Sequence, residues 1–120
     1  MQYIKGMQFY QNDKKTAITL GKFDGLHRGH ETLIERVIEH QKNDGVDSVV
    51  FAFDMAPLYE KIKKKKESLI TNEERAGRLF GRVDYLVECP FVEAVSKIEA
   101  ETFIKEILVK QFHAKYIVVG

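Results

Sequence analysis

Apolar residues along this chain form short continuous runs that alternate with stretches of helical periodicity. Such runs cover residues 16–20, 48–53, 85–89 and 116–119, and the run at 48–53 is apolar on both of its alternating faces. A strand with two apolar faces is typical of a parallel sheet that is covered on both sides. Between the runs, apolar residues recur at helical spacing over residues 29–43, 71–82 and 100–112. This order predicts an α/β fold, in which a parallel sheet with right-handed crossovers carries helices on both faces.

The predicted helices also carry boundary and packing signals. The first ends at Asn43-Asp44-Gly45, and the second begins with Thr71 and Glu74 in the spacing of a capping box. Residues 3–10 fit either a short edge strand or an ordered arm, and residues 91–97 are expected to be a connection. The helical positions expected to face inward are Leu33, Ile34, Val37, Ile38, Ala76, Leu79, Phe80, Phe103, Ile104, Ile107, Leu108 and Phe112.

Composition narrows the class of protein without changing this picture. The length of 120 residues suits one domain over residues 1–120, and 44% hydrophobic with 31% charged residues fits a soluble globular protein. A formal net charge of +1 gives no general attraction to nucleic acid or to a membrane surface, and no apolar run approaches the ~20 residues that span a bilayer. The single cysteine, Cys89, lies in an apolar run, which excludes a disulfide framework and favours a small buried side chain. We expect a cytoplasmic protein.

One turn between the first apolar run and the first helix concentrates the candidate chemistry. Its sequence is Gly21-Lys22-Phe23-Asp24-Gly25-Leu26-His27-Arg28-Gly29-His30. A strand-to-helix turn offers free backbone N–H groups and the positive end of a helix dipole to an anion such as phosphate. His27 and His30 flank Gly29, so both imidazoles can reach the same anion while the glycine lets the backbone approach closely. The spacing is neither that of a Walker A loop nor that of a dinucleotide-binding fingerprint.

The turn resembles the signature of the HxGH nucleotidyltransferase superfamily. Phe23-Asp24-Gly25 before the first histidine is similar to the adenylyltransferase domain of bacterial FAD synthetases, which are bifunctional riboflavin kinase/FMN adenylyltransferases. The similarity extends from about Thr16 to the end of the chain. Its further segments are Asp54 with Pro57, Leu69-Ile70-Thr71, residues 83–87, Phe103 with Leu108-Val109, and residues 114–120.

This resemblance implies a Rossmann-like sheet of the HUP/nucleotidyltransferase type and transfer of AMP from ATP to FMN, which gives FAD and pyrophosphate. Mg²⁺ is expected to arrive with ATP, and no metal site of the protein's own is expected. The catalytic residues implied are His27 and His30. The resemblance places ATP against Gly21, Lys22, Phe23, Asp24, Gly25, His27, Gly29 and His30, and FMN against Asp54 and Pro57.

The chain departs from the family pattern at three places. Where the family has Asp-Pro-His-Pro, this chain has Asp54-Met55-Ala56-Pro57, so the contacts with flavin are in question. The chain ends at Gly120, before the family's later Ser/Thr-rich turn with arginine, and it has no riboflavin kinase domain. We therefore expect an incomplete adenylyltransferase domain with weak or absent turnover. We also expect an exposed apolar surface where the family's next segment packs, with some tendency to self-associate.

Several alternatives stay open. Arg28 is either a phosphate contact or a solvated residue at a helix start, and Asp54 is either a flavin contact or the N-cap of a short helix. Asp24 is read as a turn former in preference to a ligand contact. The whole chain could instead be a non-catalytic flavin- or nucleotide-binding relative. It could also be an HxGH transferase with a different phosphate acceptor.

Overall fold

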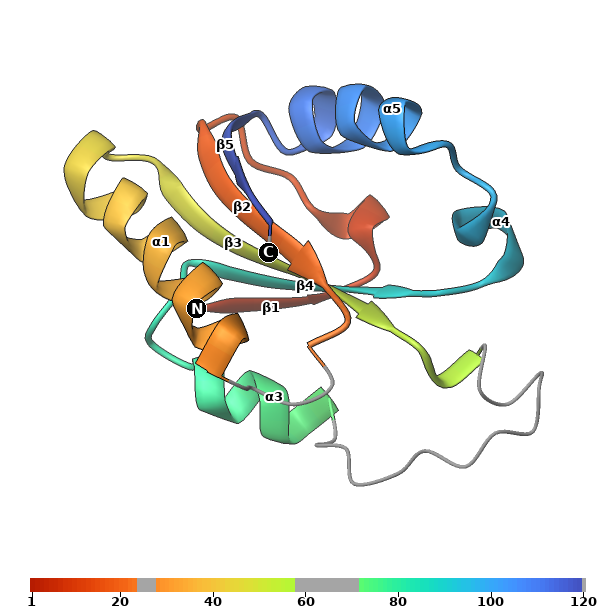
Figure 1. Ribbon diagram of the computed structural model, residues 1–120, viewed down its shortest axis with the longest axis horizontal. Helices are drawn as coiled ribbons and strands as arrows, with labels where there is room; N and C mark the ends of the chain where they lie inside the picture. Colours follow the sequence, from red (N-terminus) through yellow and green to blue (C-terminus); the bar gives the residue numbers. More distant parts are fainter. Residues whose placement is uncertain (24–27, 58–71, 120) are drawn as a thin grey trace.

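Five parallel strands form one sheet in the computed structural model, which describes residues 1–23, 28–57 and 72–119 (Figure 1). The spatial order is β1-β4-β3-β2-β5, and every neighbouring pair is parallel. The bounds are β1 Gln2–Lys5, β2 Thr16–Gly21, β3 Asp47–Asp54, β4 Tyr85–Pro90 and β5 Ala114–Val118. The predicted parallel sheet is confirmed, and the carboxyl ends of all its strands lie at one edge.

The apolar runs place the strands well. The central strand β3 is buried from Ser48 to Ala52, as expected for a strand with two covered faces. Residues 2–5 form an edge strand that pairs with β4, which decides between the two readings of the amino-terminal segment. The 3₁₀ turn η1 (Met7–Phe9) follows it. β5 begins two residues earlier than predicted and ends at Val118.

One face of the sheet carries α1 (Arg28–Asp44) and α3 (Asn72–Leu79). Ile34, Val37 and Leu79 are fully buried there. The inward position predicted for Phe80 is wrong, because this side chain is 74% exposed. The helix ends at Leu79 rather than at Arg82, since Gly81 takes a left-handed φ of 77° and breaks the helical periodicity on which that prediction relied. The proposed cap at Thr71 lies outside the described residues.

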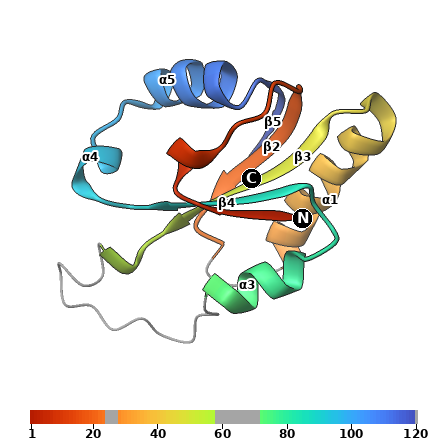
Figure 2. The ribbon, with the colours of Figure 1, turned by 180° about the vertical axis from the view of Figure 1, so that it is seen from behind.

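The opposite face carries η1, α4 (Glu93–Ser96), α5 (Ala100–Thr102) and the π-helical segment η2 (Phe103–Gln111), which continues α5. Figure 2, from behind, shows these elements on the side of the sheet away from α3. The predicted connection at residues 91–97 thus contains a short helix. The predicted helix at 100–112 is present, and Phe103, Leu108 and Phe112 are buried as expected.

Ile104 does not share that buried face, because 43% of its side chain is exposed. The Phe112 N–H donates to the Ile107 carbonyl five residues earlier at 3.0 Å, so the winding is wider than that of an α-helix. A wider turn changes which residues align on one face. The core on this side is rich in aromatic rings, with Phe112 stacked on Tyr10 at 4.2 Å between centroids. Cys89 is buried against the same core, and burial raises the pKa of its thiol, in line with the predicted structural role.

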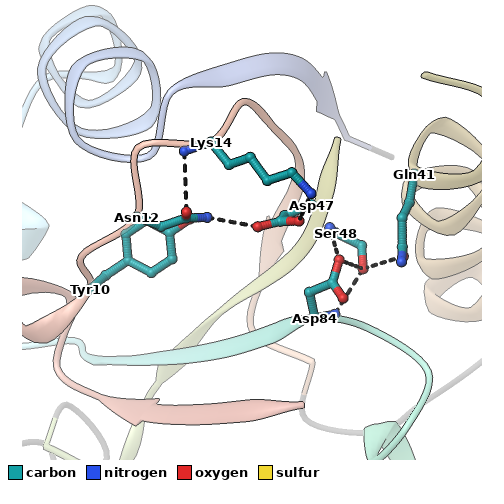
Figure 3. Close-up of polar contacts among 7 residues, drawn as sticks. All are labelled: Tyr10, Asn12, Lys14, Gln41, Asp47, Ser48 and Asp84. Carbon is teal, nitrogen blue, oxygen red and sulfur yellow. Dashed lines mark hydrogen bonds and ion pairs between the residues drawn. The ribbon is translucent and has the colours of Figure 1, made fainter. Parts of the chain in front are cut away.

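Hydrogen bonds among polar side chains and backbone groups stabilise the amino-terminal edge of the sheet (Figure 3). The Asp84 carboxylate accepts a hydrogen bond from the Ser48 N–H at 2.9 Å, and the Ser48 hydroxyl donates to Gln41 at 2.8 Å. Next to them, the Asn12 amide and the Lys14 ammonium both donate to Asp47, at 2.8 and 3.1 Å. These contacts fix the start of β3 against β4 and against the segment that precedes β2. None of the described helices is both long enough and apolar enough to span a membrane.

Candidate functional site

The carboxyl edge of the sheet brings the predicted site residues together. β2 ends at Gly21, which pairs with Ala52, and β3 continues for two more residues to Asp54. Two residues of strand correspond to about 7 Å. Gly21 and Asp54 therefore lie near each other on neighbouring strands, and α1 begins close by, next to α3 (Figure 1). This edge is where ligands bind in open parallel α/β sheets.

Phe23 forms the floor of the turn that follows β2. Its side chain is fully buried, and its backbone has a left-handed φ of 48°. Such a φ is strained for a non-glycine residue, and it persists only where the surroundings hold it. A Cβ on Gly21 would lie 3.3 Å from Cε2 of the Phe23 ring, so the absence of a side chain at Gly21 gives the ring its place. Since the ring is in the core, any contact of Phe23 with a nucleotide would come from its backbone.

His30 lies in the first turn of α1, on the side that faces Phe23. Its ring centroid is 4.9 Å from that of Phe23, and its side chain is half-buried. His30 therefore leans toward the core that covers this face of the sheet. The imidazole sits at the positive end of the α1 dipole, where an anion is favoured. Gly29 lies in the same first turn. Asp24, Gly25 and His27 lie outside the described residues, so their placement stays a prediction.

A salt bridge fixes this end of α1 to the segment after α3. The Arg82 guanidinium donates to both carboxylate oxygens of Glu31, at 2.7 and 3.2 Å. The hydrogen bond from Arg82 lowers the pKa of Glu31, and the same bond raises the pKa of Arg82. The bidentate geometry orients the first turn of α1, which carries His30.

Asp54 ends β3 and begins the loop that carries Pro57. One Asp54 carboxylate oxygen accepts a hydrogen bond from the Ala56 N–H at 3.1 Å, which is the geometry of a local cap. This bond agrees with the capping alternative. Both Asp54 and Pro57 are half-buried. Met55, at the first position that departs from the family pattern, is 4% exposed and points into the core, whereas Ala56 is exposed.

A buried ion pair that the sequence analysis missed lies directly beneath the turn. Arg75 of α3 and Glu88 of β4 join at 3.2 Å, and their side chains are 3% and 4% exposed. The Arg75 guanidinium also donates to the carbonyl of Lys22 at 2.9 Å and to that of Phe23 at 3.4 Å. The backbone of the candidate phosphate site is thus bonded directly to Arg75, and Glu88 in turn holds Arg75. Lys22 itself is exposed.

Two cavities open at this edge of the sheet. A polar cavity of about 310 Å³ lies over the ends of β1, β3 and β4, and Lys5, Asp54 and Glu88 are among its lining residues. An apolar cavity of about 370 Å³ lies between the sheet and η2, and Leu20, Phe53 and Phe91 are among its lining residues. Among the residues that the structure describes, no three His, Cys, Asp or Glu side chains gather as metal ligands would.

Comparison with known proteins agrees with this arrangement. The family model for FAD synthetase matches residues 9–120. The chain is 28% identical over 124 residues to the bifunctional riboflavin kinase/FMN adenylyltransferase of Buchnera aphidicola subsp. Schizaphis graminum, covering 100% of this chain and 39% of that protein. It is 30% identical over 106 residues to the protein of the same name from Escherichia coli K12, covering 87% of this chain and 34% of that protein.

A solved structure described as a macrolide-efflux protein from Streptococcus pneumoniae shares the fold, with a TM-score of 0.76 and 26% identity. The match covers 99% of this chain and 40% of that one. The chain therefore spans about two fifths of the length of the proteins it resembles. With a family model that matches nearly its whole length, a Rossmann-like parallel sheet and an HxGH sequence that leads into α1, the chain belongs to the FAD synthetase family.

Proposed function

We propose that this chain binds the phosphates of ATP at the turn after β2 and serves the transfer of AMP from ATP to FMN, which yields FAD and pyrophosphate. The observation that carries the proposal is the placement of Gly21 and His30. They lie at the carboxyl edge of the sheet, where α1 begins with Arg28-Gly29-His30. The FAD synthetase match over residues 9–120, with relatives named FMN adenylyltransferase, supports FMN as the adenylyl acceptor.

The reaction needs no covalent bond between the protein and the substrates. An oxygen of the FMN phosphate attacks the α-phosphorus of ATP, and a new P–O bond forms. The bond from the α-phosphorus to the bridging oxygen breaks, and pyrophosphate leaves with the electron pair. Catalysis then rests on positioning and on stabilising the charge that develops on the phosphates. His27 and His30 would donate hydrogen bonds to those phosphates, and Lys22 would add a positive charge at the exposed rim.

Backbone N–H groups from Gly21 to Gly25 and at Gly29 would approach the phosphates closely. Mg²⁺ would come with ATP, held mainly by the nucleotide and by few protein ligands, and it would supply positive charge against the charge that develops on the phosphates.

FMN would approach from the end of β3, where Asp54 and Pro57 lie. The apolar cavity offers aromatic walls from Phe53 and Phe91, whose ring centroids are 5.6 Å apart. A planar isoalloxazine ring suits such a cavity, because aromatic groups pack well in offset or edge-to-face contacts. The riboflavin kinase activity named for the relatives would reside in sequence beyond the two fifths that this chain matches.

One observation favours the second candidate function, a flavin- or nucleotide-binding module without turnover. Ala56 stands at the position where the family carries a histidine, and its small exposed side chain can neither donate to nor accept from a ligand. For that reason we expect these 120 residues to bind nucleotide and to form FAD only weakly.

The test combines binding and product formation. Calorimetric titration of the chain with Mg·ATP should show binding that His30→Ala weakens. The matched control is His40→Phe, a change on the same helix that keeps the ring stacked on Tyr116 at 3.9 Å. Incubation with ATP labelled at the α-phosphate and a panel of acceptors then identifies the reaction. FAD formation from FMN supports adenylyl transfer. Binding of ATP and FMN without product supports the binding module, transfer to another phosphate identifies a different acceptor, and failure to bind ATP refutes the proposal.

A further inference from the structure

Arg75 lies where three parts of the chain meet beneath the candidate phosphate site. It belongs to α3, its ion-pair partner Glu88 belongs to β4, and the two carbonyls that it contacts belong to the turn after β2. Its side chain is 3% exposed. The five N–H donors of a guanidinium form a rigid planar fork, so one arginine can serve a carboxylate and a carbonyl at the same time.

Core stability alone does not call for this pair. Glu88 lies in a strand whose neighbouring residues Val87 and Cys89 are apolar and buried. Removing two charges from water is costly, and replacement of a buried ion pair by apolar residues of similar volume is often neutral or stabilising. The role of the Arg75–Glu88 pair is therefore better sought in the hydrogen bonds that Arg75 makes to the backbone.

Those groups are the peptide units of the turn. The Lys22 carbonyl accepts from Arg75 at 2.9 Å, and in a trans peptide the following N–H, that of Phe23, points the opposite way. Fixing the carbonyl toward the core thus fixes the Phe23 N–H away from Arg75. The longer contact to the Phe23 carbonyl, at 3.4 Å, holds the next peptide unit as well. Phe23 has the left-handed φ of 48°, a conformation that needs such external support.

We propose that Arg75 is a positioning residue for nucleotide binding. With Glu88 as its counter-ion, it holds the backbone of Lys22 and Phe23 so that the N–H side of the turn is presented to the phosphates of ATP. The inference rests on the proposed function, because it takes ATP phosphates as the ligand of the turn. Neither Arg75 nor Glu88 touches the reacting atoms in this role. Both act through the geometry of the turn.

The deciding variant replaces the pair by apolar residues, Arg75→Met with Glu88→Met, so that neither charge is left buried alone. Urea unfolding should show stability close to that of the wild type. Backbone NMR shifts of Lys22 and Phe23, which report φ and ψ, should nevertheless change. The affinity for Mg·ATP should fall about 10- to 100-fold, the loss expected when one hydrogen bond to a charged group is removed. Arg75→Lys keeps one charge without the fork, so it should fold, shift the same two amides and lose part of the affinity.

The outcomes separate the two proposals. A stable double variant with wild-type shifts at Lys22 and Phe23, or with wild-type affinity for Mg·ATP, overturns the positioning role and leaves the proposed function intact. If the double variant does not fold, Arg75→Lys decides by the same two readouts. Failure of the wild-type chain to bind Mg·ATP refutes the proposed function, and the NMR shifts still decide whether Arg75 holds the turn.

Discussion

Because the backbone at Phe23 is strained, we predict that glycine at this position is tolerated better than alanine, the reverse of the usual order. Replacing a buried phenylalanine by alanine costs about 3–5 kcal/mol, and replacing it by glycine usually costs more. At Phe23 the φ of 48° changes the balance, because a left-handed conformation costs a non-glycine residue about 1–2 kcal/mol and glycine almost nothing. Glycine also loses about 0.4–1 kcal/mol through the greater freedom of its unfolded chain. Phe23→Gly should therefore be between about 0 and 1.5 kcal/mol more stable than Phe23→Ala.

Phe51 provides the matched control. It is also fully buried, but it lies inside β3 with extended backbone, where glycine is about 0.5–1 kcal/mol worse than alanine. The order of the glycine and alanine variants should thus reverse between the two positions. Both truncations remove a large part of a typical domain's stability, so all samples would contain the excluded osmolyte trimethylamine N-oxide.

Urea unfolding followed by far-ultraviolet circular dichroism measures the difference, since the chain has no tryptophan to report by fluorescence. The reasoning fails if glycine is less stable than alanine by a similar amount at both positions. In that case the left-handed φ at Phe23 carries no strain, and the Arg75 hydrogen bonds do not counteract any.

Three further predictions concern titration and association. Burial raises the pKa of Tyr10 to about 12, so the folded chain holds that proton more tightly than the unfolded chain. The free energy of unfolding should therefore fall as the pH rises from 10 toward 12, and Tyr10→Phe should reduce that fall in urea midpoints. The Arg82 hydrogen bond lowers the pKa of Glu31 from 4.5, so the stability that Glu31 contributes is present at neutral pH and is lost as the pH falls below 4.5. Because this site is one third exposed, Glu31→Gln should cost less than about 1 kcal/mol at pH 7. Equal acid sensitivity of the variant and the wild type in thermal melts would contradict this prediction. Ile117 lines the apolar cavity on edge strand β5 and is 37% exposed, so Ile117→Lys should reduce self-association, measured by light scattering as a mass that rises with concentration. The control Val109→Lys, at a side chain that is 45% exposed and does not line that cavity, should leave this mass unchanged.

The centre of the sheet was predictable because β2, β3 and β4 are short, largely apolar and buried on both faces. In β3 five consecutive residues are buried, and no surface position interrupts the run that marks it in the sequence. The helix positions were less secure where local backbone geometry changes the periodicity. Phe80 lies between the last residue of α3 and Gly81, which has a left-handed φ. Ile104 lies in a segment with π-helical hydrogen bonds. Neither feature leaves a regular mark on a pattern of apolar positions.

The location of the candidate site was predictable because a parallel sheet gathers its carboxyl ends at one edge. Gly21, Asp54 and His30 each follow from that rule and from the turn sequence. The conformation of the turn was not predictable. The sequence shows Phe23 next to two exposed or polar neighbours, which suits a ligand contact as well as a core ring, and only the fold places its side chain against Ile34 and Ala52 in one buried cluster.

Arg75 and Glu88 left a signal that a stricter reading of burial could have used. Glu88 interrupts the apolar run at residues 85–89, in a strand predicted to be covered on both faces, and Arg75 precedes Ala76 on a helix whose inward side is apolar. A charge at a position that the fold must bury needs a partner of opposite sign or a hydrogen-bonded role. The two residues lie 13 positions apart in the sequence, so neither position on its own points to the other. Two unexplained buried charges of opposite sign, both next to the carboxyl edge, together predict the pair, and they point to the turn that its remaining donors support.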